Sequence, residues 1–237
     1  MKKAALFVGG WEGHKPQEFC DWAVELLEGE DFEVTSYDTL APLAEPEHLA
    51  DVDLIVPIWS SARSSHQEEF GNMNAAEERG MLQLIANGCG IAGWHGHMGD
   101  AFRDHSSYHF LIGGQFVAHP PGWPDNLDPT ADYVDYDVTI TKPHDPIVEG
   151  ISSFRLKSEQ YYMLVDPSND VLGRTPLVDR GHSYPCRVEA TMGQGPSLLL
   201  LTWPRDRRPS DSSGDRDHAS RHALGSRRSA RLTRRRS

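Results

Sequence analysis

Four short apolar runs in the first part of the chain predict β-strands. Residues 53–59 (DLIVPIW) and 90–94 are almost continuously apolar, which is typical of strands covered on both faces of a sheet. Residues 4–8 and 32–37 predict two further strands, and the first of these runs ends in a glycine pair.

Stretches with helical spacing separate these runs. Within residues 19–27 apolar side chains recur three and four positions apart, between Pro16 and Gly29, which suit a helix start and a helix end. Residues 67–87 also favour a helix, although internal glycines such as Gly80 weaken that prediction. The alternation of strands and helices predicts a mainly parallel sheet with helices on both faces, an α/β fold.

Beyond residue 100 the pattern indicates shorter, separate strands. Residues 133–141 (YVDYDVTIT) alternate as an edge or antiparallel strand does, and residues 143–150 indicate a loop. Further short strands are predicted within residues 154–165 and at 170–174. The chain shows no internal repeat and no linker, so a single α/β domain is favoured over residues 1–195.

Charge divides the chain into two parts. From Gly195 onward there are 11 Arg and 4 Asp, a net charge of +7, whereas the preceding residues carry 12 Lys+Arg and 31 Asp+Glu, a net charge of −19. An acidic body disfavours nucleic acids and anionic membranes as partners. No apolar run is long enough for a membrane span and no signal-peptide core is visible, so we expect a cytoplasmic protein.

Candidate chemistry lies directly after three of the predicted strands. These places carry Gly9-Gly10-Trp11-Glu12-Gly13-His14, Ser60-Ser61-Ala62-Arg63 and His95-Gly96-His97-Met98-Gly99-Asp100. Because ligands of open parallel sheets bind outside the carboxyl ends of the strands, we expect these loops to form one pocket, with His14 and His95 facing it.

The His95-x-His97 pair allows three interpretations. Two imidazoles on an extended loop can bind a divalent metal such as zinc, with His14, Asp100 or His105 completing the ligand set. Alternatively, His95 acts in general acid–base catalysis without a metal, or the glycine-flanked histidines only bond loop backbone. No other cofactor is indicated: the G-x-G-x-x-G match at residues 88–93 precedes a predicted strand instead of following one, which argues against NAD binding.

Glu159 stands before paired tyrosines, Tyr161 among them, in a strand-like stretch. The carboxylate is either a solvated edge position or points into the pocket, where Tyr161 or Tyr162 would bind polar ligand groups. The three cysteines show no metal spacing. Cys20 lies beside an apolar helix stripe, and Cys89 precedes its strand, away from the sharp turn after a strand where a nucleophile is presented.

Five motifs occur in the order found in the ThuA-like (trehalose utilisation) family, and over roughly residues 3–195 the chain resembles that family. They are Gly10-Trp11-Glu12-Gly13-His14, GCGIAGWHGHMGDAF (88–102), LIGGQF (111–116) with His119-Pro120, His144-Asp145-Pro146-Ile147, and Ser158-Glu159-Gln160-Tyr161-Tyr162. The resemblance implies a flavodoxin-like three-layer sandwich related to class I glutamine amidotransferases. Where that superfamily has its cysteine, this chain has residues 94–96, so the resemblance argues against glutamine hydrolysis.

The resemblance also implies sugar metabolism, and two function classes stay open. The first is an enzyme acting on a trehalose-like disaccharide or its keto derivative, as an isomerase or hydrolase, beside a partner sugar oxidoreductase. Catalysis would then use His95, Glu159 and His14, and substrate would contact Trp11, Glu12, Trp94, Arg63, Asp100 and Tyr161. The second is a non-catalytic carbohydrate-binding or scaffold domain. Self-association into a homo-oligomer is compatible with either class.

Residues 196–237 differ in composition from the rest of the chain. Arg and Ser dominate, and no helical or alternating period continues past Trp203, so we expect a disordered tail. It is interpreted as the product of a frameshift near codon 195, because the family has a buried strand, a Gly-His pair and a closing helix at this place. The alternative is a native basic tail that binds nucleic acid.

Overall fold

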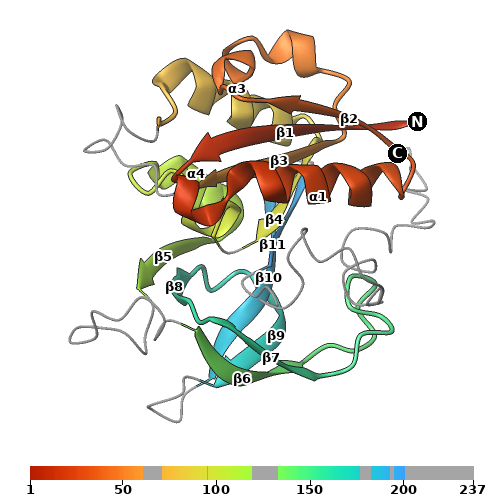
Figure 1. Cartoon of the computed structure of the whole chain (residues 1–237), viewed down its shortest axis with the longest axis vertical. Coiled ribbons are helices and arrows are strands. Elements are labelled where there is room, and N and C mark those ends of the chain that lie inside the picture. The colour runs from red at the N-terminus through yellow and green to blue at the C-terminus, as the bar shows by residue number, and fades with distance from the viewer. Residues whose placement is uncertain (61–70, 95, 119–132, 177–182, 193–194, 201–237) are drawn as a thin grey trace, which may run out of the picture.

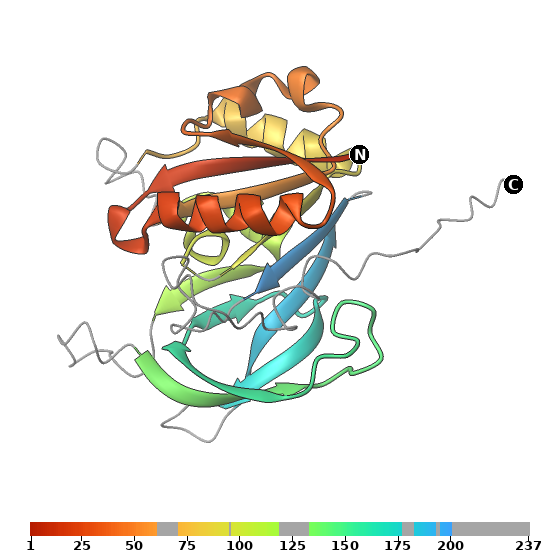
Figure 2. The ribbon, with the colours of Figure 1, turned by 45° about the vertical axis from the view of Figure 1, so that its right-hand side comes forward.

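The computed structural model describes residues 1–60, 71–94, 96–118, 133–176, 183–192 and 195–200 (Figure 1). Nine of their strands form one sheet in the order β2-β1-β3-β4-β11-β10-β9-β6-β7. The first five strands in this order are mutually parallel and the remaining ones pair in antiparallel fashion. The sheet therefore has a parallel half and an antiparallel half, which Figure 2 shows one above the other.

The parallel half has the strand order of a flavodoxin-like fold. It consists of β2 (Phe32–Tyr37), β1 (Lys2–Gly10), β3 (Leu54–Ser60), β4 (Gly90–Trp94) and β11 (Gly195–Leu200). Short 3-10 helices follow or join these strands: η1 (Glu12–His14), η2 (Ala41–Ala44), η3 (Pro46–Leu49) and η5 (Met98–Asp100).

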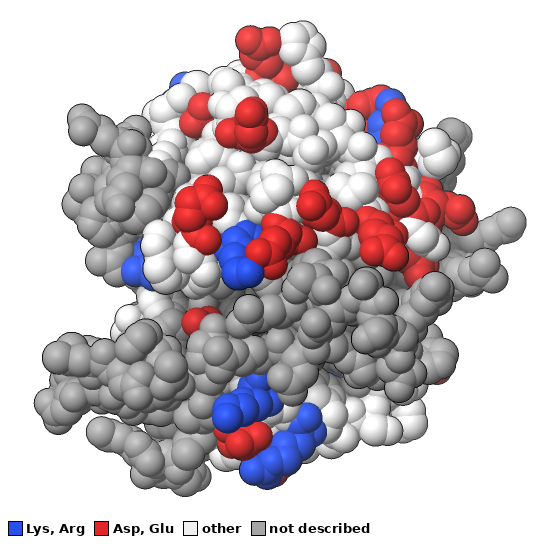
Figure 3. Space-filling model, in the orientation of Figure 1, with Lys and Arg blue, Asp and Glu red and all other residues white. Residues whose placement is uncertain are grey.

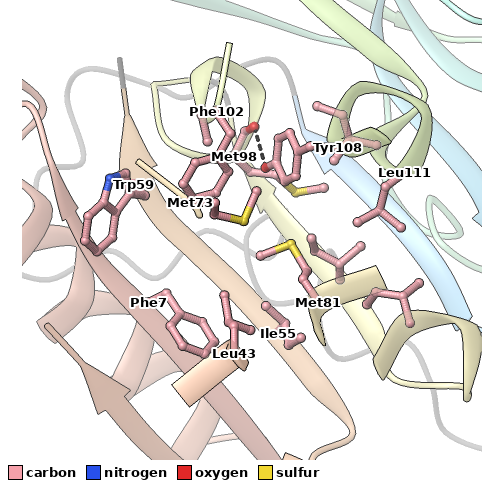
Figure 4. Close-up of a cluster of buried hydrophobic side chains, with 14 of the residues drawn as sticks. Phe7, Leu43, Ile55, Trp59, Met73, Met81, Met98, Phe102, Tyr108 and Leu111 are labelled. Atoms are coloured by element: carbon pink, nitrogen blue, oxygen red, sulfur yellow. Dashed lines mark hydrogen bonds between the residues drawn. The ribbon is translucent and has the colours of Figure 1, made fainter. Parts of the chain in front are cut away.

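Helices cover both faces of the parallel half. Helix α1 (Pro16–Glu28) lies on one face, and α3 (Ala75–Ala86) and α4 (Ser106–Ile112) lie on the other. Successive side chains of a strand point to opposite faces of the sheet and so pack against different helices. In β3, Val56 and Ile58 pack on the α1 side. Ile55 and Trp59 pack on the α3 side. Figure 4 shows the larger of these cores, on the α3 side. The predicted three-layer α/β sandwich is confirmed.

The antiparallel half continues the same sheet beyond β11. It contains β10 (Ser183–Met192), β9 (Asp170–Pro176), β6 (Tyr133–Ile140) and β7 (Phe154–Glu159). A separate ribbon pairs β5 (Gly114–Ala118) with β8 (Tyr162–Val165). Because Tyr161 lies between β7 and β8, the chain passes here from the large sheet to the ribbon.

Several sequence predictions differ from the structure in extent. The helix predicted over 67–87 begins at Ala75, because the Asn74 side chain accepts backbone hydrogen bonds and Glu77 bonds back in a capping box. Residues 61–70 lie outside the described residues. Strands β5 and β10 were not predicted, since their sequences mix polar and apolar residues without one clear period.

The predicted domain boundary at residue 195 coincides with the first residue of β11. This strand runs on to Leu200 and pairs with both β4 and β10, so five residues assigned to the tail lie inside the sheet. Residues 201–237, which carry the rest of the tail interpretation, lie outside the described residues, and that interpretation stays a prediction.

The surface of the protein reflects the excess of acidic residues before Gly195. Acidic side chains gather over α1 and the neighbouring parallel half, with few basic ones among them (Figure 3). Among the described residues, no helix is both long and apolar enough to cross a membrane.

Candidate functional site

The loops after β1 and β4 meet at the carboxyl end of the parallel half. In η1, directly after β1, the His14 backbone N–H donates to the Trp11 carbonyl at 3.1 Å. The His14 ring lies against Gly96, which follows β4: a Cβ placed on Gly96 would be 3.3–3.4 Å from three atoms of that ring. The absence of a side chain at Gly96 therefore lets the two loops pack together.

His97 lies in a largely aromatic enclosure behind His14. Its ring centroid is 5.0 Å from Phe19 of α1, 5.3 Å from Trp94 and 6.0 Å from His14. Only 1% of His97 is exposed, whereas His14 is half-buried. A ligand from solvent thus reaches His14 before it reaches His97.

Trp11 supplies an open aromatic surface beside His14. The two rings meet edge to face with centroids 4.8 Å apart, and 43% of Trp11 is exposed. The indole lies over Gly13, and the glycine leaves room for it, because a Cβ at Gly13 would be only 2.3 Å from the ring. Glu12 is also exposed at this place. Trp11 and Glu12 therefore border His14 on the solvent side.

Trp94 is placed differently from the expected platform for a sugar ring. Only 4% of it is exposed, and its ring packs edge to face on Trp22 at 5.4 Å and against Phe19 at 5.8 Å. Trp94 belongs to the core between α1 and the sheet. Its contribution is packing behind the histidines.

A second group of polar residues starts at the other end of η5. The Asp100 carboxylate, buried with its side chain 3% exposed, receives two hydrogen bonds at 2.5 Å from Arg103 Nε and Nη2. The guanidinium in turn lies 4.8 Å above the Phe116 ring of β5, and Phe116 contacts Tyr161 with ring centroids 4.8 Å apart. Asp100 thus fixes the position of Arg103 against the ribbon.

Tyr161 connects this group to Glu159. The Tyr161 hydroxyl donates to Glu159 Oε2 at 3.4 Å, and the Tyr136 hydroxyl donates to the Glu159 carbonyl at 3.0 Å. Burial, followed by the negative charges of Glu159 and Asp100, raises the pKa of Tyr161 well above 10. Tyr161 is therefore a neutral donor at physiological pH, and Glu159 keeps a half-buried carboxylate beside it.

The two groups are joined through one turn of chain. The Asp100 backbone N–H donates to the His97 carbonyl at 3.1 Å, so η5 carries His97 at one end and Asp100 at the other. The predicted residues Trp11, Glu12 and His14 come together, with His97 behind them, while Asp100, Tyr161 and Glu159 form the adjoining group. His95 and Arg63 lie outside the described residues, and their predicted roles stay predictions.

The sequence alone did not assign Arg103 or Phe116 to this arrangement. The stretch Arg103-Asp104-His105 by itself predicts a helix start, and α4 begins directly after it at Ser106, with His105 at its N-cap. The available signal was the three-residue spacing of Asp100 and Arg103, which suits an ion pair on one turn.

The metal prediction rests on His14, His95 and His97. The rings of His14 and His97 lie with their centroids 6.0 Å apart and their planes at 72° to each other. Within the described ranges no group of three or more His, Cys, Asp or Glu residues is arranged to hold a metal. The predicted three-histidine set depends on His95.

Neither of the cysteines whose side chains are described is placed as a nucleophile. Cys89 precedes β4, and burial, with a smaller effect from the Asp53 charge, raises the pKa of its thiol to about 12. Cys20 is buried on α1, and burial raises its pKa too. Both thiols therefore stay protonated near neutral pH, which disfavours thiolate chemistry.

Comparison with known proteins bears on the family and the fold. The family model described as trehalose utilisation (ThuA) matches residues 3–198. A search of curated proteins finds no match.

Among solved structures, a protein described as ThuA-like from Bacteroides uniformis ATCC 8492 superposes with a TM-score of 0.64 and 17% identity, over 95% of this chain and 89% of its own. A second ThuA-like protein, from Parabacteroides merdae ATCC 43184, gives 0.62 and 17% identity, over 84% and 78% of the two chains. A β-galactosidase from Rahnella sp. R3 gives 0.55 and 12% identity, over 94% of this chain and 30% of its own. At these identities the similarity concerns the fold alone.

Proposed function

The chain belongs to the trehalose utilisation (ThuA) family, and from this membership and the arrangement around His14 we propose that it acts on a trehalose-like disaccharide or its keto derivative. The observation that carries the proposal is the contact between Trp11 and His14 at the carboxyl end of the sheet. An open indole beside a half-buried imidazole suits a sugar: the apolar face of the ring stacks on Trp11 while a polar group reaches His14.

The proposed chemistry is proton transfer. A carbon next to the carbonyl of a keto-sugar is acidic, and an imidazole with a pKa near neutrality is suited to remove and return its proton. His14 takes this role, together with His95. Glu159, whose carboxylate accepts a hydrogen bond from the Tyr161 hydroxyl, supplies the carboxylate of the proposed reaction. Isomerisation and elimination-type hydrolysis both begin with this proton abstraction.

A second form of this proposal adds a metal ion, which requires His95 as one of its ligands. An ion bound by His14, His95 and His97 would polarise the carbonyl oxygen and so acidify the neighbouring carbon. Elemental analysis of the purified protein tests it directly. Stoichiometric zinc that is lost in His97→Ala supports the metal variant, and metal-free protein with full turnover contradicts it.

The proposed reaction can be followed through exchange with solvent. We would incubate the purified protein in D₂O with the 3-keto derivative of trehalose and measure deuterium at the carbon beside the carbonyl by NMR. Wild-type protein should catalyse exchange and His14→Ala should not. The control is His48→Ala, because His48 is an exposed histidine of η3 that pairs with neighbouring Glu45. Exchange by wild-type protein no faster than in buffer would refute the catalytic proposal.

A non-catalytic carbohydrate-binding or scaffold domain is the second candidate. It is favoured by the buried, protonated Cys89 and Cys20, which are unsuited to amidotransferase chemistry, and by the similar fold that accounts for 30% of a β-galactosidase chain. Saturable binding of the disaccharide without exchange would support it. A keto-sugar substrate would further require a sugar oxidoreductase as a partner, and measured self-association would support a homo-oligomer.

A further inference from the structure

Ser60, the last residue of β3, has a buried hydroxyl without a function in the fold. The residue is 0% exposed, and within the part of the chain that the structure describes, its Oγ has no hydrogen-bond partner. Burying a hydroxyl without a hydrogen-bond partner lowers the free energy of unfolding, so such groups are rare in folded proteins. Where one occurs, a functional role can be the reason for it.

The hydroxyl lies on the side of the sheet that carries the histidines. Strand residues alternate between faces, and Val56 and Ile58 of β3 pack on the α1 side. Ser60 is next in this series. Trp94 of β4 also belongs to the α1-side core, and its ring contacts His97 at 5.3 Å. Ser60 and the histidine group therefore share one face at the carboxyl end of the sheet.

A residue without a side chain borders Ser60 on β1. Its register partner there is Gly10, where an added Cβ would be 2.4 Å from the Ser60 backbone. On its other side β3 pairs with β4, and Gly96 lies in the loop that follows β4. Gly96 is the residue against which the His14 ring lies.

The backbone of Ser60 is also tied to the Trp11 loop. The Trp11 N–H donates to the Ser60 carbonyl at 3.3 Å, and Trp11 contacts the His14 ring. Ser60 is thus fixed beneath the same loop that presents the open indole and the imidazole. A side chain in this place is positioned by strand backbone, which makes it rigid.

We infer that Ser60 is a ligand-binding residue of this site, whose hydroxyl hydrogen-bonds a hydroxyl or carbonyl oxygen of a neutral sugar held beside His14. The inference rests on the proposed function. A hydroxyl is the suitable group, because it can donate to a keto oxygen and can donate to or accept from an alcohol, without a charge to desolvate. The sequence placed Ser60 in a loop of candidate chemistry but gave it no role.

Removal of the hydroxyl tests this inference through two readouts. In Ser60→Ala the ligand-free protein should melt about 2 °C higher than wild type, since an unpaired buried group is lost. The dissociation constant for trehalose or its 3-keto derivative should rise about tenfold. The control is Ser153→Ala: the Ser153 hydroxyl accepts from the Ile140 N–H at 3.0 Å, away from the histidines, so this variant should lose stability and keep its affinity.

The outcomes separate this inference from the proposed function. Equal affinity of wild-type protein and Ser60→Ala for the disaccharide overturns the role of Ser60 and leaves the proposed function standing. A loss of stability in Ser60→Ala as large as that in Ser153→Ala also overturns it, because the hydroxyl would then be satisfied in the fold. If wild-type protein binds neither sugar, the proposed function fails and the role of Ser60 fails with it.

Discussion

The imidazole rings of His14 and His97 lie with their centroids 6.0 Å apart, although one belongs to the loop after β1 and the other to the loop after β4. Their surroundings differ. His14 is half-buried between Trp11 and Gly96, and His97 is enclosed by His14, Phe19 and Trp94 with 1% of its surface exposed. The two histidines should therefore respond differently to the same substitution.

His14→Ala should abolish turnover without unfolding the protein. Loss of a general acid–base group lowers rates by about 10²- to 10⁴-fold. The half-exposed side chain contributes little core packing, so the free energy of unfolding should change by less than about 1 kcal/mol. Deuterium exchange into the keto-sugar measures the first effect and urea denaturation the second. Full activity of a folded His14→Ala protein would exclude His14 as the proton-transfer group.

His97→Ala should instead destabilise the fold. The substitution leaves a cavity among aromatic rings, and large-to-small changes at buried sites cost about 2–5 kcal/mol. His97→Phe keeps the aromatic volume and should recover part of this loss, which urea denaturation of both variants would show. Equal stability of His97→Ala and wild type would mean that the enclosure is not packed as described.

Asp100→Asn should be destabilising because it leaves the Arg103 guanidinium without its carboxylate. Asp100 is buried, and breaking a buried ion pair by removing one partner costs about 3 kcal/mol. The matched control is Asp137→Asn, whose partner Arg155 lies 3.5 Å away with both side chains mostly exposed. Such surface pairs contribute between about 0 and 1 kcal/mol. Similar unfolding free energies for the two variants would contradict the structural role of Asp100.

Cys89 should make the protein sensitive to alkaline pH. Burial raises the pKa of its thiol to about 12 in the folded state, against 9.0 ordinarily. Between these values the unfolded chain loses the proton that the folded chain keeps, so this contribution to stability is complete below pH 9 and decreases up to about pH 12. The slope from one such group is at most about 1.4 kcal/mol per pH unit.

The test is Cys89→Ala, compared with wild type by urea denaturation at pH 8 and pH 10.5. The variant should be less stable at pH 8, because a buried side chain is shortened, and this deficit should shrink at pH 10.5. Buried Tyr108 and Tyr161, whose pKa values are also raised, contribute equally to both proteins and cancel. A stability deficit of the same size at both pH values would show that the Cys89 thiol does not have a raised pKa in the folded protein. Turnover at pH 7 should persist in Cys89→Ala.

Four strands of the parallel half were predictable because each is marked by a local apolar signal. The predicted runs 32–37 and 90–94 coincide with β2 and β4, residues 53–59 lie within one residue of β3, and the run 4–8 falls inside the longer β1. The Pro16–Gly29 helix matches α1. The fifth strand, β11, was missed, because its residues from 196 onward were assigned to the tail. The antiparallel half was not predictable to the same degree. Its strands pair segments that are distant in sequence, as Tyr133 pairs with Glu159. The alternation of apolar and polar residues within one strand does not show with which other strand it pairs.

The candidate site was predictable in position but not in contacts. The rule that ligands lie beyond strand ends selected the loops of His14 and His97, which the structure brings together. It could not show that Trp94 turns into the α1 core, because side-chain direction after a strand depends on packing partners such as Trp22. Likewise Arg103 reaches Asp100 through local geometry that composition does not reveal.

Gly80 illustrates how packing reverses a local preference, and it supplies the last prediction. In an exposed helix interior, glycine to alanine stabilises by about 1 kcal/mol. Gly80 of α3, however, lies against η2: an added Cβ would be 1.7 Å from the Leu43 carbonyl oxygen and 2.9 Å from its carbon. Leu43 is fully buried, so that backbone cannot easily retreat. Gly80→Ala should therefore destabilise by about 1–3 kcal/mol, the cost of overpacking.

The matched variant is Ala76→Gly, the opposite exchange one turn earlier on α3, where only the ordinary preference should act and cost at most about 1 kcal/mol. Intrinsic helix preference alone predicts opposite signs for the two variants. The contact with Leu43 predicts that both lose stability and that Gly80→Ala loses more. Urea denaturation of the two proteins beside wild type decides between these expectations, because an increase in unfolding free energy for Gly80→Ala would show that α3 does not approach η2 as closely as described.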